Sequence, residues 1–299
     1  MFDLHMHSLA SDGKADFDTV VRRLAEHPEL KLVALTDHDA IIDSILLAEL
    51  EPRAWVGTEL STKHDGQTVD MLALNVRPDY APLNEYLAAR KIDRVNRFNR
   101  FGEVLRAAGW SFDPPASVYD NPQLAKPHVV AELRRHPDNA ERLLALGVPP
   151  MPGHRSEENP IYDQVLKPIN VDGDLMISTL DAIALVHAAG GLAIAAHPWI
   201  APYDKGEADV AAARNTIRLW AEAGLDGLEV FHESATDPDV RDEIMAQAIA
   251  NDLLITAGCD DHSPDLEFIG TALSADDPRA EAWLERILLA AARRRVQVL

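Results

Sequence analysis

The sequence predicts an α/β protein built on a parallel sheet or barrel, with one helical segment inserted into it. Three observations lead to this prediction. Apolar runs of four to seven residues alternate with amphipathic stretches of 10 to 18 residues, as in βα units. The alternation stops over residues 85–172. Histidines and carboxylates recur at or just after the apolar runs, where barrel enzymes place their chemistry.

Each expected strand is a short apolar run bounded by turn-forming residues. The strands are expected near residues 2–7, 32–36, 54–60, 69–76, 192–196, 226–231, 253–257 and 268–273. Amphipathic stretches predict helices between them, over residues 16–26, 40–49, 179–189, 207–223, 238–251 and 278–295. Asp16, Ser178 or Thr179, and Asp277-Pro278 are typical of helix starts, and Gly190 and Gly224 are typical of helix ends.

Residues 85–172 interrupt this alternation. They begin with a helical pattern over roughly 84–108 and continue through proline-rich segments that contain no strand-like run. The interruption holds 12 basic and 12 acidic residues, so the rest of the chain carries the entire net charge of −21. We therefore expect residues 1–84 and 173–299 to form the barrel, and residues 85–172 to form an inserted helical domain.

Composition narrows the classes of function. A net charge of −21 argues against a protein that wraps long nucleic acid, because Lys and Arg supply most of that affinity. No apolar run approaches the length of a membrane span and no targeting pattern is evident, so we expect a cytoplasmic protein that engages no membrane. The single cysteine, Cys259, excludes an internal disulfide and a thiolate-rich zinc site, which leaves nitrogen and oxygen ligands for any metal.

Metal-ligating residue types recur along the chain. In a β-strand, residues i and i+2 point to the same side, so His5 and His7 are expected to aim two ring nitrogens at one point. Taken alone, such a pair is about as often surface decoration as a pair of metal ligands. Further segments follow: Asp12, Thr36-Asp37-His38-Asp39, Gly57-Thr58-Glu59-Leu60, Ala196-His197-Pro198 and Gly258-Cys259-Asp260-Asp261-His262. Together they predict one catalytic rim at the strand ends.

In this order, the segments resemble the four motifs of the PHP (polymerase and histidinol phosphatase) family, in its nucleotide-phosphoesterase branch. The resemblance extends over residues 3–262. It implies a distorted seven-stranded (β/α) barrel with two or three divalent metals at its mouth. It also implies a helical insertion between the second and third motifs that covers the active site.

The resemblance implies a role for each matching residue. One metal would lie among four ligands: His5, His7, Glu59 and Asp260. A second would lie among three: Asp12, His38 and His262. A third would be held by His197, by Glu59 as a bridge, and by a histidine that this chain replaces with Asp70. We therefore expect two metals, with a third site on Asp70 and His197 as the alternative, and we expect His197 and Asp260 to act in catalysis.

The ligand types indicate the chemistry. Mixed imidazole and carboxylate ligands suit Mn, Fe or Zn, and the sequence does not choose among these metals. Two such ions about 3.5–4 Å apart lower the pKa of a bridging water and clamp the oxygens of a phosphate. The expected activity is hydrolysis of a phosphate ester by attack of a metal-bridging hydroxide. Asp37 and Asp261 are expected to orient neighbouring imidazoles, and His64 and His232 to have structural or solvated roles.

The insertion is expected to bind the substrate. Arg90, Arg94 and Arg97 recur at i, i+4 and i+7, which places them on one side of a helix, where they are expected to bind a phosphate. Such rows are also typical of a solvated surface, which is the alternative. His128 corresponds to a histidine that the family often keeps in its insertion, and is expected to contact the substrate.

The branch that the chain resembles most implies a particular substrate. It removes the 3′-phosphate from nucleoside 3′,5′-bisphosphates and leaves a 5′-monophosphate such as AMP, and we expect the same reaction here on a small phosphorylated nucleotide. The alternatives are a cyclic-phosphate or phosphodiester hydrolase, a 5′-3′ exonuclease on short RNA and a histidinol-phosphate phosphatase. A non-enzymatic alternative is a nucleotide-binding sensor that keeps the fold but has lost turnover.

Overall fold

The computed structural model describes residues 1–120, 124–149, 160–169, 171, 175–198, 207–232, 238–274 and 276–298. The chain forms two compact units. The first consists of Met1–Leu87 and Met176–Leu299, and the second of Ala88–Leu175. The first unit contains the sheet, and the described part of the second contains helices without strands.

The first unit is built on a seven-stranded sheet in the order β1-β2-β3-β4-β5-β6-β7. Its strands are β1 (Phe2–Asp3), β2 (Leu32–Leu35), β3 (Ala54–His64), β4 (Gln67–Leu74), β5 (Leu192–Ala195), β6 (Gly227–His232) and β7 (Leu254–Gly258). The two edges meet: the amide of Leu4 donates to the carbonyl of Ala257 at 3.0 Å, and Met6 forms a parallel bridge with Asp261. The predicted distorted seven-stranded barrel is therefore confirmed.

One strand runs against the others. β4 is antiparallel to both β3 and β5, whereas the remaining neighbours are parallel, so the expectation of a wholly parallel sheet is wrong at β4. The cause is the two-residue turn Asp65-Gly66, in which both residues have positive φ (47° and 80°). Such a turn matches the twist of two paired strands and returns the chain as a hairpin, with His64 paired to Gln67.

Two expected strands differ from the observed structure. The segment 268–273 forms turns instead of a strand, and the amide of Gly270 donates to Oδ2 of Asp3 at 2.7 Å. The first strand ends at Asp3 instead of residue 7, because the next residues pair with β7 only through the single bridge at Met6. Apolar content alone did not distinguish a buried strand from a buried loop.

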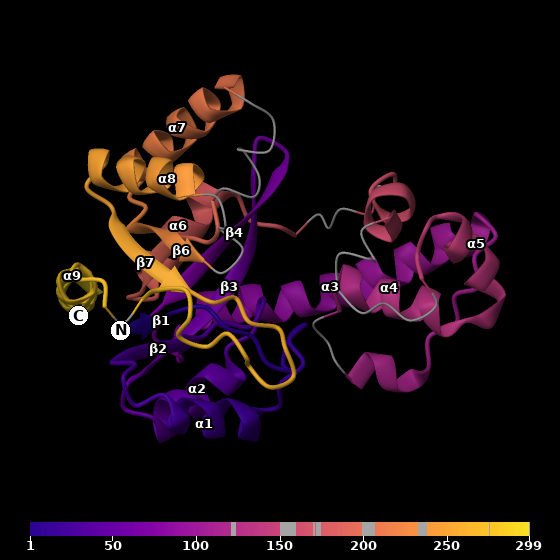
Figure 1. Ribbon diagram of the computed structural model, residues 1–299, viewed down its shortest axis with the longest axis horizontal. Helices are drawn as coiled ribbons and strands as arrows, with labels where there is room; N and C mark the ends of the chain where they lie inside the picture. The colour runs from indigo at the N-terminus through magenta and orange to yellow at the C-terminus, as the bar shows by residue number, and fades with distance from the viewer. Residues whose placement is uncertain are drawn as a thin grey trace. The chain divides into compact units, whose positions relative to one another are not determined.

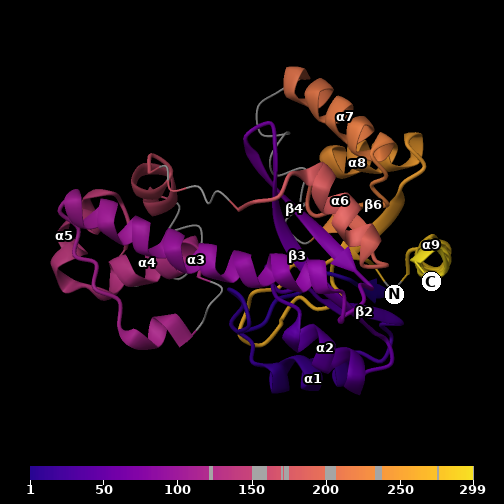
Figure 2. The same cartoon turned by 180° about the vertical axis from the view of Figure 1, so that it is seen from behind.

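Helices surround the barrel in the first unit (Figure 1): α1 (Phe17–Glu26), α2 (Ile42–Leu50), α6 (Thr179–Ala188), α7 (Glu207–Glu222), α8 (Pro238–Ala250) and α9 (Ala280–Val298). Helix α2 packs beside β2 and β3, α6 beside β5, and α8 beside β6. Figure 2 shows α2 near β2 and β3 from behind. The predicted starts at Asp16 and Ser178 are confirmed, whereas α9 begins at Ala280, two residues after Pro278. Asp16 caps α1 by accepting from the amide of Thr19 at 2.8 Å, and Ser178 caps α6 by accepting from the amide of Asp181 at 3.1 Å.

The core of the first unit lies between the strands and these helices. Strands β2, β5 and β7 are buried along their whole length, which explains why they read as continuous apolar runs. Leu60, Met71, Leu72 and Ile194 are fully buried members of this core. Its packing holds the carboxyl ends of the parallel strands in fixed positions, and these ends carry the residues of the candidate site.

The second unit has a hydrophobic core of its own, which includes Phe98, Leu105, Phe112 and Leu133. Its chain enters along α3 (Ala81–Ala107), which begins in the first unit, and the elements that follow are α4 (Lys126–Arg135), α5 (Ala140–Ala145), the 3-10 helices η1 (Ala116–Asp120) and η2 (Pro137–Asn139), and the π-helix η4 (Ile161–Leu166). Among the residues described in either unit, no helix combines the length and the apolar character needed to cross a membrane.

Candidate active site

Four of the residues expected to hold a metal form a tight buried group. The Nε2 atoms of His5 and His7 lie 3.1 Å apart. Oε2 of Glu59 lies 3.2 Å from each of these nitrogens, and Oδ1 of Asp260 lies 3.3 Å from the first and 3.0 Å from the second. Two nitrogens and two carboxylate oxygens thus converge on one point, as the sequence predicted.

His5 and His7 point to one place because the barrel closes beside them, and not because they alternate within a strand. His5 and His7 lie beyond the end of β1, and Met6 between them forms the bridge to Asp261 that closes the barrel. The amide of His7 donates to the carbonyl of Asp261 at 3.2 Å, and the amide of Asp260 donates to the carbonyl of His5 at 2.8 Å. Barrel closure therefore places residues 5–7 against residues 260–261.

A second group adjoins the first and shares His7 with it. The ligand atoms of His7, Asp12, His38 and His262 lie within 4.8 Å of one another. Nε2 of His262 is 3.1 Å from Oδ1 of Asp12, and Nε2 of His38 is 3.9 Å from the same oxygen. The imidazoles of His7 and His262 stack with ring centroids 4.2 Å apart. All three residues expected around a second metal thus lie together.

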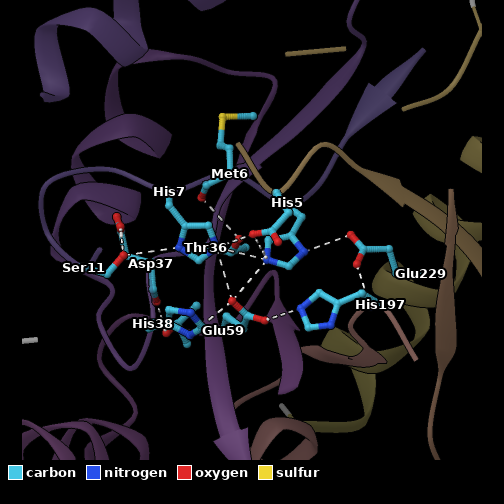
Figure 3. A network of polar contacts seen from close by, with 12 residues as sticks. His5, Met6, His7, Ser11, Thr36, Asp37, His38, Glu59, His197 and Glu229 are labelled. Carbon is cyan, nitrogen blue, oxygen red and sulfur yellow. Dashed lines mark hydrogen bonds and ion pairs between the residues drawn. The ribbon is translucent and has the colours of Figure 1, made fainter. Parts of the chain in front are cut away.

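Glu59 connects several side chains through its two oxygens (Figure 3). Oε2 lies 3.2 Å from Nδ1 of His38, and Oε1 lies 3.1 Å from Nε2 of His197. Asp70, on the neighbouring strand β4, forms a further group with His38 and Glu59. Its Oδ1 is buried without a hydrogen-bond partner among the described residues. A buried polar atom normally has such a partner, so this oxygen is available to a bound cation.

The electrostatics of the site suit cations. Burial opposes charge on His7, but hydrogen bonds to Asp260 and Glu59 more than offset it and raise the pKa of His7 to about 10. Burial also opposes charge on His197, but its contact with Glu59 raises its pKa to about 9. The surrounding imidazoles hold the pKa values of Glu59, Asp260 and Asp12 below their usual range against the effect of burial. The carboxylates therefore remain charged, and they attract either protons onto the imidazoles or a metal cation between them.

The residues present fit divalent metal ions. Imidazole nitrogens and carboxylate oxygens are the mixed ligand set that Mn, Fe and Zn accept. Nε2 of His5 and Nε2 of His7 face each other at 3.1 Å, which two neutral lone pairs would not favour without a cation or a proton between them. The pKa of Asp70 is shifted in the opposite direction from the pKa values of Glu59, Asp260 and Asp12, because burial and then the nearby charge of Glu59 raise it.

The expectation for Asp37 is confirmed, because this residue reaches an imidazole through a hydroxyl group. Oγ of Ser11 donates to Oδ1 of Asp37 at 2.6 Å and lies 3.3 Å from Nδ1 of His7. The same carboxylate accepts from the amide of Ser8 at 2.8 Å and from its hydroxyl at 2.7 Å. Asp37 thus orders the loop that leads to Asp12.

The expectation for Asp261 is wrong. Its carboxylate accepts from the amide of Ser263 and from the amide of Phe268, both at 2.7 Å, and so holds the loop after the site instead of an imidazole. The irregular segment that had been expected to form a strand follows this loop. Its polar anchors, Asp3 and Asp261, replace the ladder hydrogen bonds of a strand.

Sequence reasoning missed two residues of the site. Glu229 is buried in β6, with Oε1 3.0 Å from Nδ1 of His5 and Oε2 accepting from the amide of His197 at 2.8 Å. His232 is buried at the end of β6, and its Nε2 lies 3.2 Å from Oδ2 of Asp260, so of its two expected roles the structural one applies, at the site itself. The available signal was a carboxylate inside the apolar run 226–231, since a buried charge needs a partner.

The expected substrate-binding residues lie in the second unit. Arg90 and Arg94 are buried in α3, Arg97 is half-buried, and Nη1 of Arg90 donates to Oδ2 of Asp93 at 2.8 Å. Nδ1 of His128 accepts from the amide of Ala125 at 3.0 Å and so helps to cap α4. These contacts give Arg90 and His128 a structural role, and contact of the four side chains with a substrate stays a prediction.

The chain is similar to proteins whose names describe cleavage of phosphate esters. A 5′-3′ exoribonuclease of Haemophilus influenzae is 30% identical over 270 residues, which cover 88% of this chain and 90% of the relative. A 3′,5′-nucleoside bisphosphate phosphatase of Chromobacterium violaceum is 28% identical over 272 residues, covering 88% and 87%. A phosphoribosyl 1,2-cyclic phosphate 1,2-diphosphodiesterase of Eggerthella lenta is 28% identical over 272 residues, covering 87% and 93%. A scan against protein-family models found no match.

Solved structures share the fold. A protein of Bifidobacterium adolescentis superposes with a TM-score of 0.67 at 24% identity, and an amidohydrolase of Chromobacterium violaceum superposes with a TM-score of 0.65 at 24% identity. Each comparison covers 95% of this chain and 96% of the other. The relatives cover nearly the whole chain, and the motifs that resembled the PHP family converge in one buried site. The chain therefore belongs to the PHP-type metal-dependent phosphoesterases.

Proposed function

We propose that this phosphoesterase removes the 3′-phosphate from nucleoside 3′,5′-bisphosphates, giving a 5′-monophosphate and phosphate. The observation that carries the proposal is the pair of adjoining ligand groups that share His7, because two neighbouring cations are suited to bind and cleave a phosphate ester. The bisphosphate phosphatase of Chromobacterium violaceum supports the choice of substrate, since it matches this chain over 88% of its length.

We assign the metal ligands by these groups. One divalent ion is held by His5, His7, Glu59 and Asp260. A second is held by Asp12, His38 and His262, next to the shared imidazole of His7. Mn, Fe and Zn all suit these ligands. We favour two ions over three, because Asp70 takes the place where the family scheme has a longer imidazole ligand.

Ions bound in this way supply a nucleophile at neutral pH and neutralise charge on the phosphate. The protein side chains have separate tasks. Asp260 directs Oδ1 toward His5 and His7 and Oδ2 toward His232, so it orients the ligand group. His197 is partly exposed and is held by Glu59 at 3.1 Å, so we assign it to contact the substrate phosphate or to give a proton to the departing ribose oxygen.

The second candidate function is 5′-3′ exonuclease activity on short RNA. It is favoured by the exoribonuclease of Haemophilus influenzae, which is 30% identical to this chain over 270 residues. The net charge of −21 argues against long RNA, although it does not disfavour a short oligonucleotide with few phosphates. Cleavage of a cyclic phosphate is a third outcome that the same ligand groups allow.

One assay separates these functions. The Mn-loaded protein is incubated with adenosine 3′,5′-bisphosphate, with adenosine 2′,3′-cyclic phosphate and with a short 5′-phosphorylated oligoribonucleotide, and the released phosphate and AMP are quantified. We expect phosphate and AMP in equal amounts from the bisphosphate, at the highest kcat/KM of the three. Preferred cleavage of the oligonucleotide or the cyclic ester overturns the substrate assignment. Binding of AMP without turnover of any substrate overturns the assignment as an enzyme and supports a sensor.

A further inference from the structure

Glu229 holds two residues of the site at once, although it belongs to neither of the two proposed metal groups. Its side chain is fully buried in β6. Oε1 lies 3.0 Å from Nδ1 of His5, and Oε2 accepts from the backbone amide of His197 at 2.8 Å. Figure 3 shows the carboxylate between the two residues, on the side of the His5 ring that faces away from Glu59. Both oxygens are thus engaged by nitrogen donors.

The first contact selects the tautomer of His5. A carboxylate oxygen only accepts, so Nδ1 must carry the proton of this hydrogen bond. In the neutral ring the lone pair then lies on Nε2, which is the atom that faces His7, Glu59 and Asp260. A carboxylate on the far side of an imidazole fixes its orientation and raises its basicity as a metal ligand.

The second contact holds a strained backbone. His197 has φ of 29°, in the left-handed region that costs a residue with a side chain about 1–3 kcal/mol. The bond from its amide to Glu229 stabilises this conformation, and the conformation places Nε2 of His197 3.1 Å from Glu59. One carboxylate therefore connects an imidazole that follows β1 with the backbone of a residue that follows β5.

The chain leaves room for this carboxylate at one specific residue. A Cβ atom added to Gly258 would lie 2.4 Å from Oε1 of Glu229 and 2.2 Å from Cβ of His5. Both distances are shorter than real Cβ contacts allow, so only glycine permits the close approach. Glu229 of β6 and Gly258 of β7 thus pack tightly with His5, which follows β1.

We propose that Glu229 is a positioning residue that keeps the lone pair of His5 Nε2 directed at the metal ligand group and fixes His197 at its edge. The inference rests on the metal centre assigned under the proposed function. It adds that metal affinity depends on a side chain that does not ligate the metal.

Glu229→Gln tests the proposal with a nearly isosteric change. The two donors lie at different oxygens of Glu229, so the single oxygen of the amide replaces only one of these acceptors and the NH₂ group faces the other donor. If its NH₂ group faces His5, it donates to Nδ1, and the neutral ring then carries its proton on Nε2, the atom that must bind the metal. We expect the affinity for Zn²⁺, measured by competition with a chromophoric chelator, to fall about 10–100-fold, as is typical when a hydrogen-bond partner of a metal ligand is changed. Glu229→Asp keeps the charge but cannot reach both donors, so we expect weakened binding there as well.

Asp226→Asn is the matched control. Asp226 precedes the same strand and also contacts an imidazole and a backbone amide: its Oδ2 lies 2.8 Å from Nε2 of His187 and accepts from the amide of Ala193 at 2.8 Å. Its Oδ1 accepts from Nη2 of Arg294 at 2.6 Å. It has no contact with either ligand group among the described residues. We expect this variant to be less stable but to bind Zn²⁺ as the unchanged protein does.

The outcomes separate the inference from the proposed function. Wild-type Zn²⁺ affinity and kcat in Glu229→Gln overturn the inference alone, and full recovery in Glu229→Asp shows that charge, not positioning, is required. Absence of metal binding by the unchanged protein overturns the proposed metal centre. If Glu229→Gln does not fold, long-range ¹H–¹⁵N spectra of the Zn²⁺-loaded unchanged protein test the inference, and the His5→Gln variant assigns the signals of His5. We expect the ring proton of His5 on Nδ1. A proton on Nε2 overturns the inference.

Discussion

Oε1 of Glu59 lies 3.1 Å from Nε2 of His197, so a carboxylate from the middle of β3 meets an imidazole that follows β5. The other oxygen of Glu59 faces His5, His7 and His38 at 3.2 Å each. Glu59 therefore connects the ligand groups in addition to the His7 that they share. Its exposed fraction is 1%, so water does not weaken these interactions.

Removal of a metal ligand should abolish metal binding and activity together. Loss of a side chain that hydrogen-bonds to a metal ligand typically lowers activity by roughly 10–100-fold. In His5→Ala or Asp260→Ala, which remove a ligand itself, we expect a larger loss. Metal content by elemental analysis and phosphate release measure the two effects on the same sample. His27→Ala, at a partly exposed residue that contacts Glu29, serves as control. Full activity in either ligand variant would contradict the assignment.

Removal of the metal should also lower stability. A cluster of buried carboxylates and imidazoles gains its compensating charge from bound ions, and each ion at 100 times its Kd adds about 2.7 kcal/mol to the free energy of unfolding. We expect dialysis against a chelator to lower the melting temperature and remove activity, and Mn²⁺ to restore both. An unchanged melting temperature with unchanged metal content after dialysis would show only incomplete removal, so metal content is measured on every sample. An unchanged melting temperature in metal-free protein contradicts the prediction.

Asp70 decides how many ions are bound. It lies with His38 and Glu59, and its buried Oδ1 has no hydrogen-bond partner among the described residues. We expect two metal ions per chain in the unchanged protein and a third in Asp70→His, because the longer imidazole reaches further and adds no negative charge. Elemental analysis against protein concentration measures both. Three ions in the unchanged protein would overturn the two-metal assignment.

Gly258→Ala should disturb the site through packing alone. The added methyl group would lie 2.2 Å from Cβ of His5, and overpacking of this kind costs about 1–3 kcal/mol. We expect weaker Zn²⁺ binding together with a lower free energy of unfolding. Gly66→Ala is the control, since its Cβ meets nothing within 4 Å and its cost is confined to a turn with φ of 80°. Equal Zn²⁺ affinity in both variants would contradict the prediction.

The second unit should lose stability in acid through Glu132. Burial opposes the charge of this residue, but hydrogen bonds from Arg135, His136 and the amide of Asp113 more than offset it and lower its pKa. The folded pKa lies below the unfolded value, so the stabilisation is present above about pH 4.3 and is lost as pH falls through the folded pKa. Glu132→Gln should cost about 1–3 kcal/mol at pH 7.

Denaturant unfolding of both proteins between pH 7 and pH 3 measures this effect. The difference between the unchanged protein and Glu132→Gln should be largest at pH 7 and should shrink in acid, because protonation removes the charge that the variant already lacks. A difference that stays constant over this range would show that Glu132 contributes through packing and not through its charge.

Several features of the protein could be predicted from local sequence. The caps at Asp16 and Ser178 depend on a side chain and an amide three residues away, so the local pattern contains both partners. The helix ends at Gly190 and Gly224 require positive φ, which glycine adopts at little cost. The turn Asp65-Gly66 was also a local signal, and reading it would have predicted that β4 is antiparallel.

The sequence by itself determined which residue types could bind a metal and that they follow buried strands. Only the tertiary structure decided which of them meet. The contact between His5 and Glu229 joins residues 224 positions apart, and it exists because the chain after β1 pairs with β7, the neighbour of β6, where the barrel closes. No local sequence pattern predicts this contact, since the two side chains are brought together by strand register and core packing. Both depend on the whole first unit.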